Sequence, residues 1–377
     1  MSDDLTLSVV DQSPVRKGGT AADALQESVR LAQIVERLGY ARYWVAEHHN
    51  TGSFAGTSPE ILIGRIAAAT DSIRVGSGGV MLSHYSALKV AEQFRMLESL
   101  FPGRIDLGIG RAPGSDGLTA AALAYPRPQI DIEQFPQQVV DVLGFLHGAI
   151  NPEHPFAKIE IQPGPPPATA PEVWLLGSSD YSARLAAMLG LPFAFADFFG
   201  RTSGIGPTVA DIYRREFRPT VFGAEPRLNV TLQVVCAPSE AEAARVASSR
   251  RFMRAARVLG IRGGLLPPEE AASHELPDEA RRAAEESGRS AIDGDPDQVR
   301  AGILEAADRY GTRDLGVVTN CYAFEDRVCS YELVAEAFGL TPRQVPEADA
   351  VDWTEAGVHN PGKAGAPAPA PTRRNLP

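Results

Sequence analysis

The stretch Arg42–Asn50, RYWVAEHHN, decides the fold of this chain. A short apolar run, Tyr43–Ala46, ends abruptly in a carboxylate and two adjacent histidines, and helical patterns lie on both sides of it. Buried parallel strands that end in titratable side chains are typical of α/β barrels, whose active sites lie at the carboxyl ends of the strands. We therefore expect Glu47, His48 and His49 to lie at the C-terminal end of a strand.

Short apolar runs alternate with helical patterns along most of the chain. In Ala22–Leu38 apolar residues recur at helical spacing, and Gly39 ends the helix. Strands that alternate with helices form a parallel sheet, and repetition of this unit over most of the chain favours an α/β fold, a closed (β/α)8 TIM barrel with insertions. A doubly wound open parallel sheet is the alternative. The expected strands are Leu5–Val10, Tyr43–Ala46, Ile73–Gly79, Ile105–Ile109, Val173–Leu176, Phe193–Ala196, Leu228–Val235 and Asp314–Thr319. The expected helices include Ala22–Leu38, Pro59–Thr70, Leu88–Leu100, Phe135–Leu146, Ser182–Leu189, Glu240–Leu259 and Asp297–Tyr310.

The pattern predicts one barrel domain over residues 1–345. Long excursions in a compact domain are usually lids or binding elements. The residues 352–377 are rich in Pro, Ala and Gly and bury too little apolar surface to order themselves, so we expect a disordered tail. The expected insertions cover residues of about 112–133, 151–171 and 261–296, the last with a helical piece at Asp278–Glu286.

Bulk properties exclude several classes of protein. The 377 residues carry a formal net charge of −11, which disfavours binding to nucleic acid or to a membrane surface. The N-terminal residues lack the positive charge of a signal peptide, so we expect a cytoplasmic protein. Cys236, Cys321 and Cys329 form no CxxC pair and are expected to be buried, reduced thiols.

A run of small residues, Gly76–Gly79 (GSGG), ends one expected strand. Glycine weakens a strand, so the run needs a physical reason. The reason is either the close approach of a flat ligand to Ser77, Gly78 and Gly79, or a bulge or tight packing between strands. The sequence leaves both explanations open.

Two further motifs are suited to an anion. Arg111 follows a strand, where an arginine holds a phosphate or carboxylate or forms an ordinary surface ion pair. Gly177, Ser178, Ser179 and Ser182 lie at the start of an expected helix. Unsatisfied backbone N–H groups and hydroxyls at such a position suit a phosphate monoester, although ordinary serine capping gives the same pattern.

A metal site receives little support. His48 and His49 are possible ligands, but neighbouring residues on an extended backbone point to opposite sides. The sequence has no HExxH motif. We predict no metal ligands, and a metal-dependent barrel hydrolase is the remotest alternative.

Taken together, the ordered motifs WVAEHHN, IRVGSGGVML, AEQF, PGRIDLGIGRAPGSD and LLGSS resemble the bacterial luciferase-like family of flavin monooxygenases. The resemblance runs from Leu5 to about Leu340. Within the family, the chain is most similar to the branch that holds antibiotic-tailoring oxygenases such as that of the mensacarcin pathway.

The resemblance implies a (β/α)8 barrel that binds FMN at the C-terminal ends of its strands. His48 matches the catalytic histidine of the family, and Glu47 is suited to orient a histidine. Gly78–Gly79 match two residues joined by a non-proline cis peptide beneath the flavin. The positions that match the phosphate-binding site of the family are Arg111, Ser178, Ser179 and Ser182.

The sequence departs from the family pattern at three places. Gly110 replaces a reactive cysteine of luciferase, so no thiol is available near the flavin ring. Ser83 stands where this branch has proline, and Asp197-Phe198 stand where it has Ser-His.

The resemblance therefore implies an FMN-dependent monooxygenase that receives FMNH2 from a separate flavin reductase. It would insert one atom of O2 into a small organic molecule, such as a polyketide or another secondary metabolite. His48 would move the proton with a pKa near neutrality, residues 261–296 would form the lid, and the chain would act as a homodimer. The alternatives are a flavin- or deazaflavin-dependent dehydrogenase and a non-catalytic flavin-binding protein. Four phenylalanines, expected to be either pocket wall or core, are Phe193, Phe195, Phe198 and Phe199.

Overall fold

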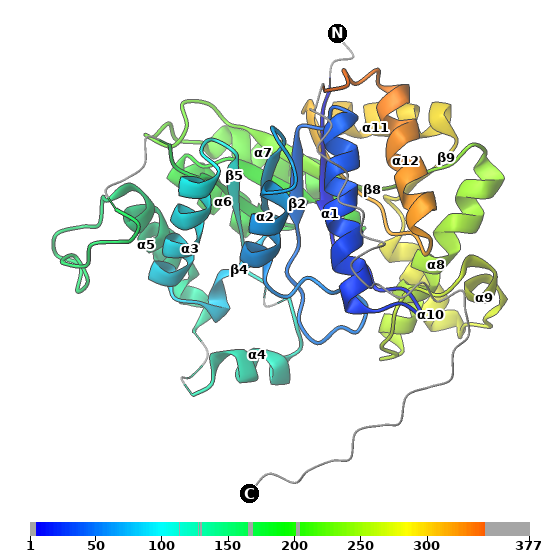
Figure 1. Cartoon of the computed structure of the whole chain (residues 1–377), viewed down its shortest axis with the longest axis horizontal. Coiled ribbons are helices and arrows are strands. Elements are labelled where there is room, and N and C mark those ends of the chain that lie inside the picture. Colours follow the sequence, from blue (N-terminus) through cyan, green and yellow to red (C-terminus); the bar gives the residue numbers. More distant parts are fainter. Residues whose placement is uncertain are drawn as a thin grey trace, which may run out of the picture. The chain divides into compact units, whose positions relative to one another are not determined.

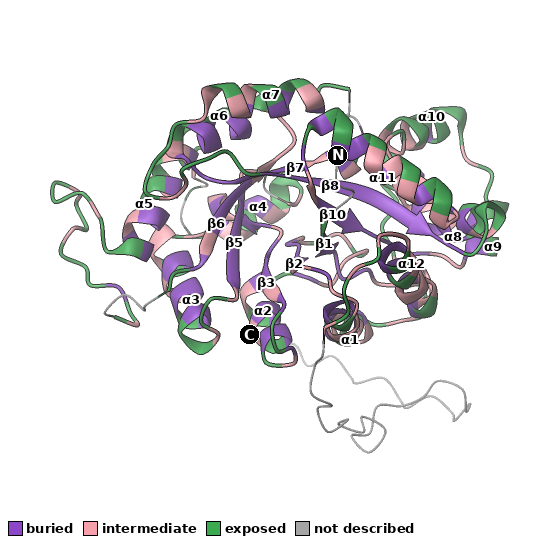
Figure 2. Cartoon of the chain, turned by 90° about the horizontal axis from the view of Figure 1, so that it is seen from above, coloured by how far each residue is buried: buried purple, intermediate pink, exposed green. Residues whose placement is uncertain are grey.

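The computed structural model describes residues 5–112, 114–126, 128, 130–164, 169–200 and 204–343. Within these residues the chain forms a closed barrel of eight parallel strands surrounded by helices (Figures 1 and 2). The strands run round the barrel in the order β1, β2, β3, β5, β6, β7, β8 and β10, and the pairing of β10 with both β8 and β1 closes it. The predicted TIM barrel is confirmed, and the open sheet is wrong.

All the strands expected from the sequence are present, with ends within two residues of those predicted. Gly78–Gly79 divide the third expected strand into two, and the second part, β4, pairs with β5. A further strand, β9, lies in the region expected as an insertion and pairs with the C-terminal end of β8. The strands are β1 (Thr6–Asp11), β2 (Arg42–Val45), β3 (Arg74–Ser77), β4 (Val80–Met81), β5 (Ile105–Gly110), β6 (Glu172–Gly177), β7 (Phe193–Ala196), β8 (Leu228–Cys236), β9 (Ile292–Gly294) and β10 (Asp314–Val318).

The helices cover the outside of the barrel, with their buried faces toward the strands (Figure 2). Gly39 adopts φ +93 after α1, and an added Cβ there would lie 2.3 Å from the carbonyl oxygen of Thr341, so glycine ends this helix as expected. Short 3-10 turns follow β4 (Leu82–His84), precede α5 (Ile132–Gln134) and follow β7 (Asp197–Phe199). The structure adds α4, α7, α9 and α12 to the expected helices. The helices are α1 (Ala21–Arg37), α2 (Pro59–Ala67), α3 (Ala87–Leu100), α4 (Gly117–Ala124), α5 (Phe135–His147), α6 (Asp180–Leu189), α7 (Gly206–Glu216), α8 (Glu240–Val258), α9 (Pro268–Ser273), α10 (Asp278–Ser287), α11 (Pro296–Tyr310) and α12 (Phe324–Ala337).

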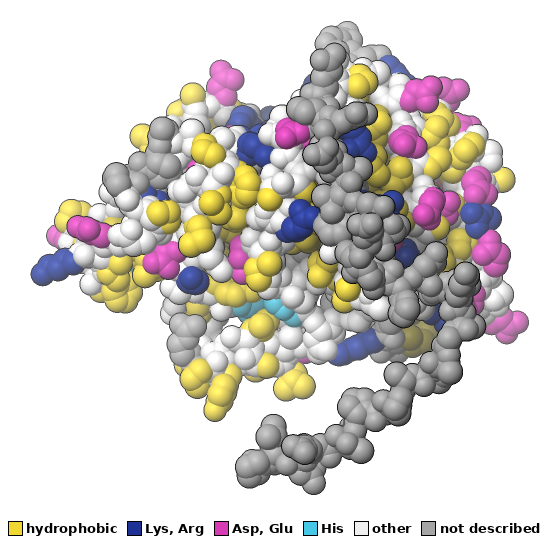
Figure 3. All heavy atoms as spheres, in the orientation of Figure 1, with side chains coloured by type: hydrophobic (Ala, Val, Ile, Leu, Met, Phe, Trp, Pro, Cys, Tyr) yellow, Lys and Arg dark blue, Asp and Glu magenta, His cyan; other side chains and the backbone are white. Residues whose placement is uncertain are grey.

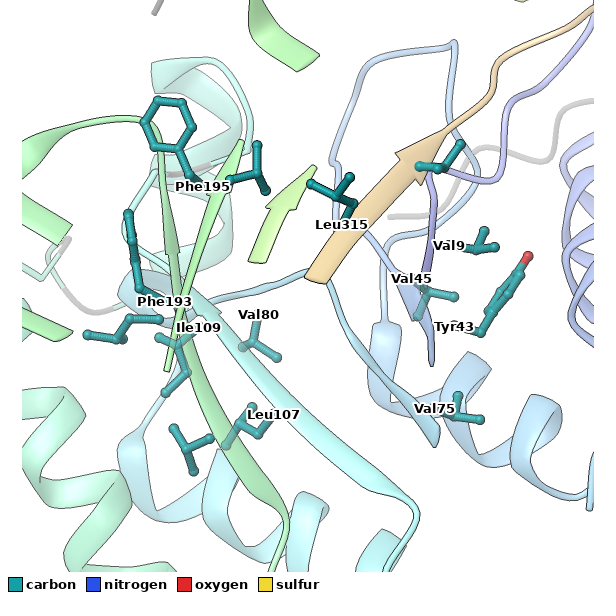
Figure 4. Close-up of a cluster of buried hydrophobic side chains, with 14 of the residues drawn as sticks. Val9, Tyr43, Val45, Val75, Val80, Leu107, Ile109, Phe193, Phe195 and Leu315 are labelled. Carbon is teal, nitrogen blue, oxygen red and sulfur yellow. The ribbon is translucent and has the colours of Figure 1, made fainter. Parts of the chain in front are cut away.

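Strand β2 shows how side chains that point alternately outward and inward contribute to two hydrophobic cores, one outside and one inside the barrel. Tyr43 and Val45 point outward into the large core between strands and helices (Figure 4), whereas Trp44 points into the barrel. Inside, Trp44 meets Trp174 edge to face, with ring centroids 5.3 Å apart. The interior cluster consists of Val10, Trp44, Trp174, Ala194 and Val318, with Leu176 and Phe198 packed against it.

Charged side chains close the N-terminal end of the barrel. Asp106 is fully buried and accepts hydrogen bonds from Arg74 and from the indole of Trp44. Arg42 is paired with Asp314 at 3.0 Å. Because these charges are paired with groups of the barrel itself, this end is a structural plug, and the C-terminal end remains for chemistry.

The expected tail and the expected insertions are described to different extents. The tail at 352–377 lies outside the described residues. Within about 112–133 and 261–296, the structure places helices α4, α9 and α10 and strand β9, so these excursions are largely structured. Among the described residues, no helix is both long and apolar enough to cross a bilayer.

Candidate active site

The parallel strands bring the predicted site residues to one end of the barrel. Glu47–His49 follow β2, Gly78–Gly79 follow β3, Arg111 follows β5, and Gly177–Ser179 end β6. The backbone N–H of His49 donates to the carbonyl of Gly114 at 3.2 Å, which joins the loops after β2 and β5. Figure 3 shows histidine side chains at the surface of this region, between the level of β4 and that of α4.

Glu47 organises the rim although it is completely buried. Its carboxylate accepts three hydrogen bonds: from the hydroxyl of Tyr85 at 2.7 Å, from His49 Nε2 at 2.8 Å, and from the backbone N–H of Met81 at 2.9 Å. Buried carboxylates require such donors, because an unpaired buried charge costs several kcal/mol. The histidine that Glu47 orients is therefore His49, and the two strand ends after β2 and β4 are tied together.

His48 is held differently from His49. Its backbone N–H donates to the carbonyl of Gly56 at 2.8 Å, and its ring lies against Phe54 with centroids 4.8 Å apart. Its Nδ1 atom is buried without a hydrogen-bond partner among the described residues. Burial, and next the positive charge of Arg257, lower the pKa of His48 to about 4. The expectation of a near-neutral pKa is wrong, and His48 is an uncharged imidazole at pH 7.

The small residues after β3 have a packing reason. An added Cβ on Gly79 would lie 2.8 Å from the carbonyl oxygen of Gly108, so a larger residue does not fit beside β5. On Gly78 it would lie 3.3 Å from side-chain atoms of Val10 and Trp44, and the Ser77 hydroxyl donates to the same Gly108 carbonyl at 2.8 Å. The peptide between Gly78 and Gly79 is cis, as the family resemblance implies. Tight strand packing thus explains Gly79, and the contact of this run with a flavin stays a prediction.

The start of α6 fits a phosphate group. Ser179 is the N-cap residue, yet its side chain makes no capping hydrogen bond, so the first N–H groups of this ten-residue helix are left for another acceptor. An added Cβ on Gly177 would lie 2.5 Å from the buried Ser182 hydroxyl oxygen, so glycine is required there. Ordinary serine capping, the competing explanation, does not apply to Ser179. Ser178 lies one residue earlier and is partly buried.

Arg111 lies next to this helix. The carbon of its guanidinium is 4.1 Å from the centroid of the Tyr181 ring, in the first turn of α6. In the described part of the chain, no carboxylate forms an ion pair with Arg111, so the surface ion pair considered from sequence is not found. Arg111 and the α6 N-terminus together form a positively polarised corner that suits a phosphate group.

The departures from the family pattern follow β7 and β4 and end β5. Asp197 is fully buried, accepts a hydrogen bond from the Tyr310 hydroxyl at 2.8 Å, and has its pKa raised by burial. Its carboxylate therefore binds a residue of α11. Phe198 packs against the barrel interior. Ser83 lies partly buried in the turn after β4, and the Cβ position of Gly110 is 3.4 Å from the Met81 sulfur.

The four phenylalanines have separate roles. Phe193 and Phe195 are buried in the outer core and are labelled there in Figure 4. Phe199 is exposed. Phe198 alone joins the interior cluster, and its ring lies 4.3 Å from that of Phe199. Phe198 is therefore the one of the four suited to face a ligand.

Some residues of the rim were not anticipated from sequence. Tyr85 and His84 follow β4, and the His84 ring lies 5.9 Å from that of His49. Arg254 and Arg257 of α8 also reach this end of the barrel. Their spacing in RRFMRAAR was visible in the sequence, but a helical row of arginines is usually a solvated face, so only the packing identifies it.

In the ranges that the structure describes, no group of three His, Cys, Asp or Glu side chains is placed to hold a metal ion. Cys236 and Cys321 are buried and Cys329 is partly buried, all as free thiols. Burial raises the pKa of the Cys236 and Cys321 thiols to about 12, so they stay protonated.

Comparison with known proteins agrees with this geometry. The family model for luciferase-like monooxygenases matches residues 5–313. The chain is 45% identical over 336 residues to the YwcH protein of Bacillus subtilis (strain 168), covering 89% of this chain and 99% of that protein. It is 35% identical over 337 residues to the N-acetyl-S-alkylcysteine monooxygenase of the same organism, covering 88% of this chain and 98% of that enzyme. The crystal structure of apo-MsnO8 is 40% identical with a TM-score of 0.81, over 90% of this chain and 100% of that one. The chain therefore belongs to the luciferase-like family of flavin-dependent monooxygenases.

Proposed function

We propose that this enzyme is an FMN-dependent monooxygenase that takes FMNH2 from a separate flavin reductase and inserts one atom of O2 into a small organic substrate. The observation that carries the proposal is the joint position of two features. An anion-binding corner, formed by Arg111 and the start of α6, lies at the same barrel end as the uncharged His48. A flavin phosphate and a proton-transfer group are needed together in this chemistry.

The corner provides the donors for the FMN phosphate. The free N–H groups at the start of α6, with Ser178 and Ser179, form one side, and Arg111 forms the other. Ser182 is buried beneath Gly177 and supports this turn. Reduced FMN, when bound, supplies the two electrons that activate O2.

His48 acts as an uncharged proton-transfer group. Because its pKa lies near 4, it is uncharged and only weakly basic at neutral pH, so it relays a proton released in the reaction and does not retain it. Its Nδ1 atom is buried and lacks a partner among the described residues. Glu47 contributes indirectly by holding His49 and Tyr85 in fixed positions.

We propose that the segment from 261 to 296 excludes water from the site. Leu265 pairs with the loop after β1, through backbone hydrogen bonds of 2.7 Å from Lys17 and 2.8 Å to Val15. Arg262 forms a salt bridge of 2.8 Å with Asp116 at the start of α4. These contacts support the proposal that the segment covers the catalytic end of the barrel, where a dry site protects the oxygenation from competing hydrolysis.

Two chemical classes of substrate follow from the relatives. One relative acts on N-acetyl-S-alkylcysteine, which has a thioether sulfur for the oxygen to attack. The similarity to MsnO8 supports the other class, a polyketide or related secondary metabolite. Phe198 offers an aromatic surface for either class.

The test combines the full chain with FMN, NADH, a flavin reductase and 18O2. N-acetyl-S-benzylcysteine and an aromatic polyketide are supplied as substrates, and oxygen uptake and product mass are measured. We expect one labelled oxygen atom in a product. Failure to bind FMN in either redox state overturns the proposal, and substrate-dependent flavin reduction without oxygen uptake replaces it with a dehydrogenase.

His48→Ala separates binding from chemistry. FMN affinity is expected to remain and product formation to fall by at least about a hundredfold, because a positioned proton-transfer group contributes about that factor. His147→Ala, at the end of α5, is the matched control. Full oxygenation by His48→Ala removes this residue from the mechanism.

A homodimer is supported by the exposed apolar side chains of α2 and α3. Ile61 is 71% exposed, Met96 58% and Leu100 64%. Exposed apolar groups on neighbouring helices suit an interface between two copies of the chain. Light scattering coupled to gel filtration should give twice the mass of the chain, and Ile61→Glu should reduce it to one copy.

A further inference from the structure

The turn after β7 continues the alternation of that strand. Along β7 the side chains of Phe193 and Phe195 lie in the outer core, and Ala194 between them lies in the barrel interior. Just beyond the strand, the Asp197 carboxylate meets α11 on the outside, and Phe198 packs against the interior cluster. Phe198 therefore lies inside the barrel, at its catalytic end.

Phe198 is also accessible. It is only partly buried, whereas Trp44 and Trp174 of the same interior cluster are at most 1% exposed. The opposite end of the barrel is closed by Asp106 and its partners. A partly exposed residue inside a barrel that is closed at one end is reached through the other end. Phe198 thus presents an apolar surface to a molecule that enters the catalytic opening.

The same cluster supports the small residues that are predicted to contact the flavin. An added Cβ on Gly78 would lie 3.3 Å from side-chain atoms of Val10 and Trp44, which both belong to this cluster. Gly78 and Phe198 therefore rest on one common floor, reached from β3 and from β7. A substrate bound beside a flavin on Gly78 would have Phe198 as its apolar neighbour.

Side chains from two other elements hold the turn that carries Phe198. Arg254 Nη2 of α8 donates to the Phe198 carbonyl at 3.1 Å, and the Ser290 hydroxyl donates to the preceding carbonyl at 2.9 Å. Gly200 ends the turn at φ +74, and an added Cβ there would overlap the carbonyl oxygen of Ser287 at the end of α10. Two successive carbonyls and the end of the turn are thus fixed from outside β7.

We propose that Phe198 is a specificity-determining residue that binds the apolar group of the substrate, an aromatic ring or an alkyl chain, and that Arg254 and Ser290 position it. This inference rests on the proposed function and adds the chemical nature of the group that the opening selects. A polar group placed against the ring and the cluster beneath it would lose its hydration without gaining a hydrogen bond from them. Ser290 belongs to the segment proposed as the cover, so the cover and the substrate wall are linked.

The test compares two ligands that differ only in the group on sulfur, N-acetyl-S-benzylcysteine and N-acetyl-S-methylcysteine. Their dissociation constants for the FMN-bound enzyme are measured by calorimetry. We expect the benzyl compound to bind at least about tenfold more tightly, because its ring buries far more apolar surface than a methyl group.

Phe198→Ala is the decisive variant. It should reduce the benzyl-to-methyl preference to less than about threefold and leave the affinities for FMN and for the methyl compound unchanged. Phe198→Tyr keeps the aromatic ring and should keep the preference. Phe156→Ala, which removes an exposed ring far along the chain from β7, is the matched control and should also keep it.

Ser290→Ala tests the positioning role. It removes one donor to the turn and should lower the benzyl-to-methyl preference by about threefold with FMN affinity unchanged, and Arg254→Gln should act in the same direction. A merely structural role would lower the melting temperature and leave the preference intact. Ser273→Ala is the control, because it removes a similar hydroxyl-to-carbonyl bond of 2.9 Å within α9.

Three outcomes overturn the inference. They are a preference that Phe198→Ala leaves unchanged, equal binding of the two compounds by the wild type, and no binding of the benzyl compound. An unchanged preference in both Ser290→Ala and Arg254→Gln overturns the positioning role. A failure of the proposed function is recognised separately, since the wild-type chain would then bind no FMN or form no labelled product. In that case the two dissociation constants are measured on the FMN-free chain, and the same outcomes decide.

Discussion

The strongest structural prediction concerns the carboxylate of Glu47. Glu47→Gln keeps the size of the side chain but replaces one acceptor oxygen with an NH2 group. The three donors that now meet this carboxylate, from His49, Tyr85 and Met81, can then no longer all be satisfied. Because one buried donor loses its acceptor and the other bonds lose their charge assistance, we expect the free energy of unfolding to fall by about 3 kcal/mol.

Urea unfolding followed by circular dichroism measures this change. Tyr85→Phe removes a single bond and leaves the carboxylate with two donors, so its expected cost is about 1 kcal/mol. The double variant should cost less than the sum of the two single ones, because they share one hydrogen bond. If Glu47→Gln unfolds within about 0.5 kcal/mol of the wild type, the carboxylate does not organise the rim.

Three other predictions concern single sites. Because the pKa of His48 is lowered from 6.5 to about 4, the unfolded chain binds more protons than the folded chain between these values, and stability should fall as the pH drops through this window. An NMR titration that protonates His48 near pH 6.5 in the folded enzyme contradicts this. Gly177→Ala should lower the free energy of unfolding by about 2 kcal/mol and weaken FMN binding, because the new Cβ overlaps Ser182. Adding Ser182→Gly to this variant should restore part of the stability. If it restores none, the overlap is not the cause. Tyr181→Leu should raise the Kd for FMN about threefold, because it removes the ring over which the Arg111 guanidinium lies. A flavin fluorescence titration measures this Kd, and an unchanged value refutes the role of Tyr181 in orienting Arg111.

Much of the fold was predictable because its signals are local. Each barrel strand is a short apolar run between helical patterns, and β2 shows it most clearly, since Tyr43–Val45 can be buried on both faces only in a parallel sheet covered by helices. Strand β9 was missed because three residues, Ile292–Gly294, are too few to form a recognisable pattern. Helix α4 was missed because its sequence, GLTAAALA, has no amphipathic period.

The chemistry of the site was only partly predictable. The order of Glu47, His48 and His49 after a strand indicated the catalytic end of the barrel, but it did not indicate which histidine the carboxylate holds. Adjacent side chains diverge, and the choice depends on Tyr85 and Met81, which come from another part of the chain. The pKa of His48 likewise depends on burial and on Arg257, more than two hundred residues away.

The sequence alone determined the barrel and the set of groups at its catalytic end, because strand alternation and strand-end motifs are properties of neighbouring residues. Only the tertiary structure decided how those groups act. Barrel closure brings β2 opposite β7, and folding brings Arg254 of α8 to the carbonyl of Phe198, directly after β7. Charge and burial depend on distance in space, and a one-dimensional pattern does not contain that distance.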